Sequence, residues 1–314
     1  MTFLGIDTSA YTTSAALVAN GELRQVKMLL PVKQGERGLR QSDAVFAHIK
    51  QLPEVLSSLF DGFDGKISAV GVTSRPRDAE GSYMPCFLAA KPCAAAFALS
   101  YNAPLYDFSH QAGHIEAAAH TCGREMELGD DFLAFHVSGG TTELLRVRRS
   151  GRGDVPYDIE IVGRTLDISA GQAIDRAGVM LGCAFPSGPQ LEKLAQQSDL
   201  EYKPRASVRD GSCNLSGVEN QCKKLLDSNI PKRDIARYVL DSAAATIIEM
   251  THHALKTRTP NCPVLFAGGV MCNELIRKKL ETRFNAIFAL PEYSSDNAAG
   301  IALLAEKRYM QSRQ

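Results

Sequence analysis

The sequence carries no excess of either charge. It has 35 basic and 35 acidic side chains, so its formal net charge is zero when histidine is neutral. A balanced chain exerts no overall attraction on nucleic acid, so any contact with RNA must come from a local basic patch. The best candidate for such a patch is a group of four arginines that lie close together in the sequence, Arg146, Arg148, Arg149 and Arg152.

Three further absences narrow the class of protein. No uninterrupted apolar run reaches the roughly 18 residues that indicate a membrane span. The N-terminus, MTFLGIDTSAY, has no basic leader, so we expect no signal peptide. The eight cysteines form no C-x-x-C pair, which argues against a thiolate zinc site and against a disulfide scaffold. We therefore expect a cytoplasmic protein with no membrane partner.

What is present is a globular composition with an internal repeat. The 314 residues, 45% of them hydrophobic and 22% charged, are enough for two domains. The stretch FLGID reads as a buried strand, TSAYTTS as a polar turn, and SAALVANGEL as a second strand running back. The same order returns about 130 residues later in FLAFHVSGG, TT and ELLRVRR. The repeat predicts two similarly folded halves.

The rest of each half reads as alternating helices and strands. Hydrophobic periodicity predicts helices over residues 41–60, 233–256 and 299–312, and a strand over 67–74. Residues 262–284 read as a strand, a Gly-Gly turn and a helix, and residues 197–217 are the loosest stretch. This pattern predicts an α/β fold of two actin-like, ribonuclease H-like domains with a nucleotide in the cleft between them.

Small polar turns supply the expected phosphate contacts. Glycine, serine and threonine expose backbone N–H groups and hydroxyls without side-chain obstruction. A helix that follows such a turn can also bind an anion at its N-terminus. Any one of these turns is more often only a tight turn, so their order and spacing carry the prediction. The candidate turns are Asp7-Thr8-Ser9, Ser138-Gly139-Gly140 and Gly268-Gly269.

A histidine-rich segment, HQAGHIEAAAH over residues 110–120, is the second candidate site. His110 and His114 are four residues apart and share one face of a helix, a recurring way to present two imidazoles to a metal. His120 lies about 240° further round the helix than His114 and cannot join them. Gln111 stands where a zincin protease needs a glutamate. The spacing alone also fits two structural or surface histidines.

Six motifs in order resemble the family of tRNA threonylcarbamoyladenosine transfer enzymes, also called the glycoprotease or O-sialoglycoprotein endopeptidase family, within the actin-like ATPase superfamily. The resemblance covers essentially the whole chain. The motifs are SHQAGH (109–114), HVSGGTTEL (136–144), GRTLDISAGQAIDR (163–176), LGCAFPSGP (181–189), FAGGVMCN (266–273) and YSSDNAAGIA (293–302).

The resemblance assigns two sets of site residues. It implies one divalent metal (iron, zinc or magnesium) with open coordination positions, as a catalytic metal needs. Its ligands would be His110, His114 and Asp296. It also implies an adenine nucleotide, whose contacts would be Val137, Ser138, Gly139, Gly140, Asp175, Gly188 and Asn273. We expect an N-terminal domain over 1–108 and a C-terminal domain over 109–314 that carries both motif sets, with the last helix packing back across.

The chain also departs from the family pattern. Tyr11 and Thr12 replace a pair of acids in the opening turn. Arg75-Pro76-Arg77 replaces a G-P-G loop and is followed by a short insertion, DAEGS, over 78–82. Thr141 replaces a histidine, and LSGVEN (215–220) lacks the family's lysine. The metal and adenosine motifs are kept, whereas the residues around the reacting end have changed.

The function implied by the resemblance is threonylcarbamoyl transfer from an adenylate donor to adenosine of tRNA, an acyltransferase reaction. The loss of the paired acids favours an alternative, a retasked paralogue that binds nucleotide and metal and serves a partner protein. A metallopeptidase is the third interpretation and lacks a visible general base. The expected partners are an adenylate small molecule, tRNA and, as a heterodimer, a paralogous actin-like protein.

Overall fold

The computed structural model describes residues 1–9, 11–31, 39–151, 155–257, 261–293 and 298–313. The chain forms two compact units, each of which draws on separate stretches of sequence. Unit 1 consists of Met1–Thr121, Arg149–Asp158 and Glu292–Gln314, and unit 2 consists of Cys122–Arg148 and Ile159–Pro291. The sequence prediction placed its single boundary between residues 108 and 109, ahead of the histidine helix, which belongs to unit 1.

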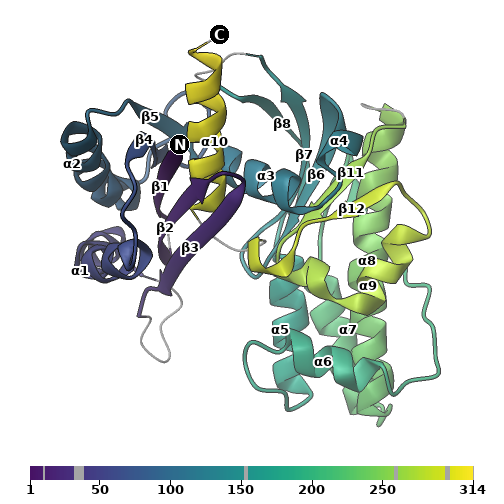
Figure 1. The fold of residues 1–314 in the computed structure, drawn as a ribbon. Coiled ribbons are helices and arrows are strands. Elements are labelled where there is room, and N and C mark those ends of the chain that lie inside the picture. The colour runs from purple at the N-terminus through teal and green to yellow at the C-terminus, as the bar shows by residue number, and fades with distance from the viewer. Residues whose placement is uncertain (10, 32–38, 152–154, 258–260, 294–297, 314) are drawn as a thin grey trace. The chain divides into compact units, whose positions relative to one another are not determined.

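A five-stranded sheet forms the centre of unit 1, in the order β3-β2-β1-β4-β5 (Figure 1). The first three strands are antiparallel neighbours, and β4 and β5 continue the sheet parallel to β1. Their bounds are β1 Thr2–Thr8, β2 Thr12–Ala19, β3 Glu22–Leu29, β4 Ile67–Arg75 and β5 Leu105–Ser109.

The stretch SAALVANGEL contains a hairpin, so the prediction of one returning strand was wrong. Asn20 and Gly21, with φ angles of 51° and 83°, end β2 and turn the chain into β3. Positive φ at both central residues is what a tight hairpin turn requires, and Asn-Gly is its preferred sequence. All but the last residue of β2 are buried, whereas β3 has exposed and half-buried positions, as expected for an edge strand.

Helices cover both faces of the unit 1 sheet. On one face, α1 and α2 pack on Leu4, Ile6 and their neighbours; on the other, α3 and α10 pack on Phe3 and Ala16. The strand alternation that sends Phe3 and Leu4 to opposite faces explains both cores. The helices are α1 Gln41–Phe60, η1 Pro85–Ala89, α2 Ala90–Tyr101, α3 His110–Thr121 and α10 Ala299–Gln311.

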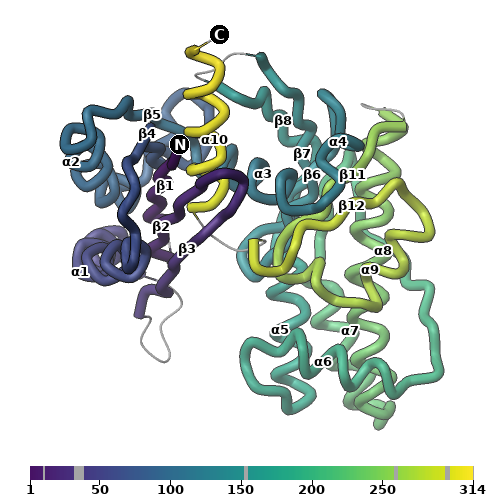
Figure 2. The backbone as a smooth tube through the Cα atoms, viewed as in Figure 1, coloured from purple at the N-terminus to yellow at the C-terminus, as the bar shows by residue number. Residues whose placement is uncertain are grey.

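The last helix, α10, lies against the first strand (Figures 1 and 2). Glycines allow its backbone to approach the backbone of its neighbours closely. A Cβ atom on Gly5 of β1 would overlap the backbone nitrogen of Ala302, and one on Gly300 would overlap the carbonyl oxygen of Gly113 in α3. The helix that carries the two histidines is therefore held directly by α10.

Unit 2 repeats this plan with a second five-stranded sheet, in the order β12-β11-β6-β7-β8. Here β6 pairs antiparallel with β7 and parallel with β11, as β1 does with β2 and β4. The predicted repeat is confirmed. The strands are β6 Asp131–Val137, β7 Thr142–Arg149, β8 Tyr157–Arg164, β11 Val264–Ala267 and β12 Ala286–Phe288.

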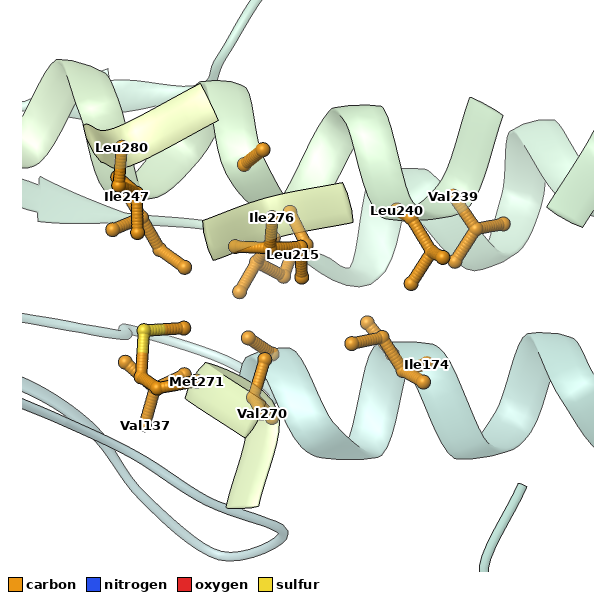
Figure 3. Packing of buried hydrophobic residues seen from close by; sticks show 14 of the residues in the cluster. Val137, Ile174, Leu215, Val239, Leu240, Ile247, Val270, Met271, Ile276 and Leu280 are labelled. Atoms are coloured by element: carbon orange, nitrogen blue, oxygen red, sulfur yellow. The ribbon is translucent and has the colours of Figure 1, made fainter. Parts of the chain in front are cut away.

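The helices of unit 2 enclose a large apolar core (Figure 3). Ile247 of the long helix α8 and Ile276 of α9 belong to it, together with Val137 at the end of β6. The loose stretch predicted over 197–217 contains only the two-residue strands β9 Val208–Arg209 and β10 Ser212–Cys213 and the start of α7. The helical elements are α4 Glu125–Leu128, α5 Ala170–Met180, α6 Gly188–Ala195, α7 Ser216–Asp227, α8 Lys232–Thr257, η2 Gly269–Cys272 and α9 Glu274–Glu281. The short helix η3 Pro291–Tyr293 begins at the last residue of unit 2 and ends in unit 1.

Within the described ranges, no helix combines the length and the apolar character needed to cross a membrane.

Candidate functional site

The histidine pair of α3 converges in unit 1. Helix α3 starts directly after β5, and Ser109 caps it, because its Oγ accepts a hydrogen bond from Ala112 N at 3.2 Å. His110 and His114 lie one turn apart, and their Nε2 atoms approach to 2.9 Å. The two rings therefore point their Nε2 atoms at the same place, as the helical spacing predicts.

Asp7 supports His110 from the end of β1. The residue has no solvent exposure, and its Oδ1 lies 3.1 Å from His110 Nδ1. This contact places the proton of the ring on Nδ1 and leaves the lone pair on Nε2, the atom that faces His114. Asp7 Oδ2 has no hydrogen-bond partner among the described residues. The sequence prediction had placed Asp7 in a phosphate turn; the structure places it behind the histidine pair.

The donor set fits a divalent metal as far as the structure describes it. His110 Nε2 and His114 Nε2, 2.9 Å apart, are imidazole nitrogens of the kind that first-row divalent metals take as ligands. Asp7 Oδ2, buried and without a hydrogen-bond partner among the described residues, is a further oxygen on the residue that contacts His110. The described residues contain no group of three such side chains that could hold a metal, and Asp296, the third predicted ligand, lies outside them.

The turn that replaces the family's acids is held by a buried histidine. His48 of α1 is fully buried, with Nε2 2.8 Å from Ser9 O and Nδ1 2.8 Å from Thr13 Oγ1. Burial lowers the pKa of His48, although the Ser9 carbonyl and the negative charge of Asp7 oppose the shift. Tyr11 is 46% exposed at this turn, whereas Thr12 is buried. His48 was not singled out in the sequence, because its partners lie more than thirty residues away.

The glycine-rich turn of unit 2 packs against the start of α5. Ser138 closes the turn, because its N donates to Thr141 O at 2.8 Å and its Oγ accepts from Thr141 N at 3.2 Å. Ser169, the N-cap of α5, donates its hydroxyl to Gly139 O at 2.7 Å. A Cβ atom on Gly171 would lie 2.5 Å from Ser138 O. The N-terminus of α5 is therefore in direct contact with the predicted phosphate turn.

Open space lies beside this turn. Added Cβ atoms on Gly139 and Gly140 would meet no atom within 4 Å, and both residues are exposed. A cavity of about 350 Å³ adjoins them, lined by Gly140, Thr141, Thr142, Glu143, Arg164, Thr165 and Leu166. The side chain of Val137, by contrast, is in the core of unit 2, so only its backbone is available to a ligand. Thr141, which stands where the family has a histidine, lines the cavity.

Asp175, in the middle of α5, lies beside the residue that precedes Gly188. Asp175 Oδ1 accepts a hydrogen bond from Ser187 N at 2.7 Å, immediately before Gly188, the first residue of α6. Asp175 is half-buried, and Gly188 has open space where a side chain would stand. The structure thus brings these two predicted residues together, with one carboxylate oxygen of Asp175 already engaged by the protein.

Asn273 caps α9. Its Oδ1 accepts a hydrogen bond from Ile276 N at 3.0 Å, and only 8% of the residue is exposed. Glu192 of α6 reaches the same helix end, where its Oε1 accepts from Glu274 N at 2.6 Å. Gly268 lies just before η2 with φ of 103°, and a Cβ there would overlap the carbonyl of Val137. The Gly268-Gly269 turn is therefore packed on the end of β6, next to the phosphate turn.

The predicted basic patch is weaker than the sequence suggests. Arg146 makes a bidentate ion pair with Asp131, at 2.6 and 3.1 Å, across the β6–β7 pairing. The hydrogen bond to Asp131 raises the pKa of Arg146, although burial opposes the shift. Arg148 is exposed, Arg149 belongs to unit 1, and Arg152 lies outside the described residues.

Sequence comparison agrees with the motifs. A family model described as tRNA N6-adenosine threonylcarbamoyltransferase matches residues 32–303. The chain is 30% identical to the tRNA N6-adenosine threonylcarbamoyltransferase of Thermosipho africanus, over 98% of this chain and 94% of that protein.

Solved structures agree with the fold. The chain matches component A of the (R)-2-hydroxyglutaryl-CoA dehydratase of Acidaminococcus fermentans with a TM-score of 0.59 and 14% identity, over 99% of both chains. It matches the ROK hexokinase of Thermus thermophilus with a TM-score of 0.50 and 16% identity, over 100% of this chain and 99% of that one. Both units have the actin-like ATPase fold, as the sequence predicts.

Proposed function

The chain belongs to the tRNA N6-adenosine threonylcarbamoyltransferase family, a family of acyltransferases that act in tRNA modification, and on that premise we propose that it transfers a threonylcarbamoyl group from an adenylate donor to an adenosine of tRNA. In this reaction the N6 nitrogen attacks the carbamoyl carbon, and a C–N bond forms. The bond from that carbon to the phosphate oxygen breaks, adenosine monophosphate leaves, and N6 loses a proton.

The observation that carries this proposal is the convergence of His110 Nε2 and His114 Nε2 at 2.9 Å, backed by Asp7. We infer that these nitrogens, with Asp296, hold a divalent metal that polarises the acyl carbonyl when bound. Asp7 keeps His110 in the tautomer that presents Nε2. The set of two imidazoles favours a transition metal over magnesium.

The donor nucleotide has a separate set of residues in unit 2. We infer that its phosphate lies at the Ser138–Gly140 turn, where Gly139 and Gly140 are exposed and the N-terminus of α5, the positive end of the helix dipole, packs against the turn. Asp175 has one carboxylate oxygen bound to Ser187 N, and the other can accept from ribose hydroxyls. Gly188 and Asn273 complete the set, and the open space beside Gly188 leaves room for a ligand.

A second candidate, a retasked paralogue that binds nucleotide and metal for a partner protein, is favoured by the Ser9–Thr13 turn. Tyr11 and Thr12 leave this turn without the family's two acids, and Thr12 is buried. Loss of one positioned polar group in an active site typically costs on the order of 10² to 10³ in rate. We therefore expect this chain alone to transfer slowly.

Complementation decides between the two candidates. The chain is expressed in a strain depleted of its own transfer enzyme, and threonylcarbamoyladenosine in tRNA is measured by mass spectrometry. The matched variant is Tyr11→Asp, which returns one acid to an exposed position of the turn. Partial modification that Tyr11→Asp increases and His114→Ala abolishes supports the transferase. No modification by any variant, with nucleotide binding intact, would point to the retasked paralogue.

A further inference from the structure

The loop between β4 and η1 is one of the parts of unit 1 in which this chain departs from the family pattern. It contains Arg75-Pro76-Arg77 and the insertion over 78–82. Arginines in such a loop can either bind an anionic ligand or pair with a neighbouring acid. The structure shows a pair for Arg75, whose Nε and Nη2 lie 2.9 and 2.5 Å from Asp78 Oδ1.

The second oxygen of Asp78 faces a different element. Ser109 Oγ donates a hydrogen bond to Asp78 Oδ2 at 2.6 Å, and the side chain of Asp78 is only 11% exposed. Ser109 is the fully buried residue that caps α3 and precedes His110. Because the Ser109 hydroxyl proton is directed to Asp78, its lone pairs point back to Ala112 N, the orientation that a cap requires.

The backbone of the loop makes a second contact with the same helix end. Pro76 O accepts a hydrogen bond from Gln111 N at 3.0 Å. The first N–H groups of a helix have no partner within the helix, so each must be satisfied from outside. Two of them, those of Gln111 and Ala112, are satisfied by the loop or by a serine that the loop orients. The negative charge of Asp78 at a helix N-terminus is favourable as well.

We propose that Asp78 is a positioning residue for the metal-binding pair, acting through Ser109 on the first turn of α3. Asp7 fixes the ring of His110, and Asp78 fixes the backbone that carries it. In place of the family's glycine-proline-glycine segment, the loop thus has a clamp, by which we mean the hydrogen bond from Ser109 to Asp78 and the hydrogen bond from Gln111 to Pro76. The proposal rests on the proposed function in one respect, that His110 and His114 hold a metal.

The test is a cobalt(II) titration of the full chain, followed by the visible absorption of the bound ion. Asp78→Ala should lower the affinity about tenfold, in the range found for groups that orient metal ligands. The matched control is Glu80→Ala, which removes the same charge from an exposed position in the same loop and should leave the affinity unchanged. Asp78→Asn, which keeps an oxygen for Ser109, should retain most of the affinity and serves if Asp78→Ala does not fold.

A double-mutant cycle shows whether Asp78 acts through Ser109. Ser109→Ala should weaken cobalt binding, and adding Asp78→Ala should then have little further effect, because the two residues act as one unit. Additive losses would overturn the proposal. Equal losses of cobalt affinity in Asp78→Asn and Asp78→Ala would also overturn it, because the charge of Asp78 alone would then explain the effect.

Hydrogen exchange in the metal-free protein separates this proposal from the proposed function. Amides of residues 110–114 should exchange faster in Asp78→Ala and Ser109→Ala, and at the wild-type rate in Glu80→Ala. Unchanged exchange in all variants overturns the clamp, even when the wild type binds cobalt. Faster exchange with no cobalt binding by the wild type supports the clamp and refutes the proposed metal.

Discussion

Asp175 has one partner in the protein and one proposed partner in the ligand, each at a different carboxylate oxygen. Its Oδ1 is bound to Ser187 N, so the chain segment before α6 depends on it. Only the remaining oxygen is available to a ribose. A substitution at this position therefore changes both the protein and the proposed ligand contact, and the two effects must be separated.

We predict that Asp175→Ala weakens adenine-nucleotide binding by about 1–3 kcal/mol, the cost of losing a charged hydrogen-bond acceptor. Asp175→Asn keeps an oxygen for Ser187 N, so it should preserve thermal stability while still weakening the nucleotide. Titration calorimetry with ATP, ADP and AMP in the presence of metal measures the affinity, and thermal unfolding measures the stability. The control is Asp227→Ala, a change at an exposed position. If Asp175→Asn and Asp175→Ala both bind nucleotide with wild-type affinity, Asp175 does not contact the nucleotide.

His48 gives the fold a pH dependence of its own. Burial lowers its pKa, so the folded chain resists a proton that the unfolded chain accepts below about pH 6.5. The free energy of unfolding should therefore fall as the pH drops below 6.5, until the pH reaches the lower pKa of the folded state. One such group contributes at most about 1.4 kcal/mol per pH unit in this window.

We predict that His48→Gln flattens this dependence, because glutamine can keep a polar contact to the turn but does not titrate. Urea unfolding between pH 5 and pH 7.5 measures the effect. The exposed His252→Gln is the control and should keep the wild-type slope. A His48→Gln slope equal to that of the wild type would show that another group causes the pH dependence.

At the scale of elements, α3 and α10 approach each other most closely at Gly300, where an added Cβ would overlap the backbone of Gly113 and Ala117. Gly113 in turn leaves the space that the side chain of Ile301 occupies. The position of the histidine helix therefore depends on the lack of a side chain at these two glycines. Crossings of this kind tolerate no added methyl group unless one helix moves.

We predict that Gly300→Ala destabilises the protein by about 1–3 kcal/mol, the usual cost of overpacking. Gly217→Ala is the matched control, because Gly217 is also the second residue of its helix but has open space at its Cβ position. It should be neutral or stabilising, since alanine favours the helix. Thermal unfolding of the two variants measures the difference, and equal stability would contradict the close approach.

Elements with strong periodicity could be predicted from the sequence. The helix expected over 41–60 is α1, and the strand expected over 67–74 is β4, one residue longer. The turn between β2 and β3 was not predicted, although Asn20-Gly21 is a typical hairpin sequence. The apolar residues on both sides of it were interpreted as a single strand. The role of Asn273 as a helix cap was also visible, since an asparagine before a helical pattern is an N-cap signal.

The contacts that complete the candidate sites could not be predicted in the same way. Asp7 meets His110 over 103 positions of sequence, and Asp78 meets Ser109 over 31. Such pairs depend on the order of strands in the sheet, which places the ends of β1, β4 and β5 side by side. The motif resemblance located the residues His110, His114 and Asp175, but tertiary packing decides which groups their side chains touch.

At the scale of the whole molecule, each unit is assembled from separated stretches. Unit 1 takes its first 121 residues, the stretch Arg149–Asp158 and the segment from Glu292 onward. Unit 2 is contained between these stretches, and the proposed nucleotide residues Ser138, Asp175 and Asn273 all belong to it. The histidine pair belongs to unit 1, so the two proposed sites are carried by different units.

The close packing of α10 on β1 and α3 has a consequence for the order of synthesis. On the ribosome, the sheet and the histidine helix of unit 1 emerge long before the helix that covers them. During that interval the face of the sheet with Phe3 and Ala16 lacks α10 and is covered from its own unit by α3 alone. The nascent chain must remain soluble with this face only partly covered, and a chain that ends before residue 299 has a histidine helix without the packing of α10.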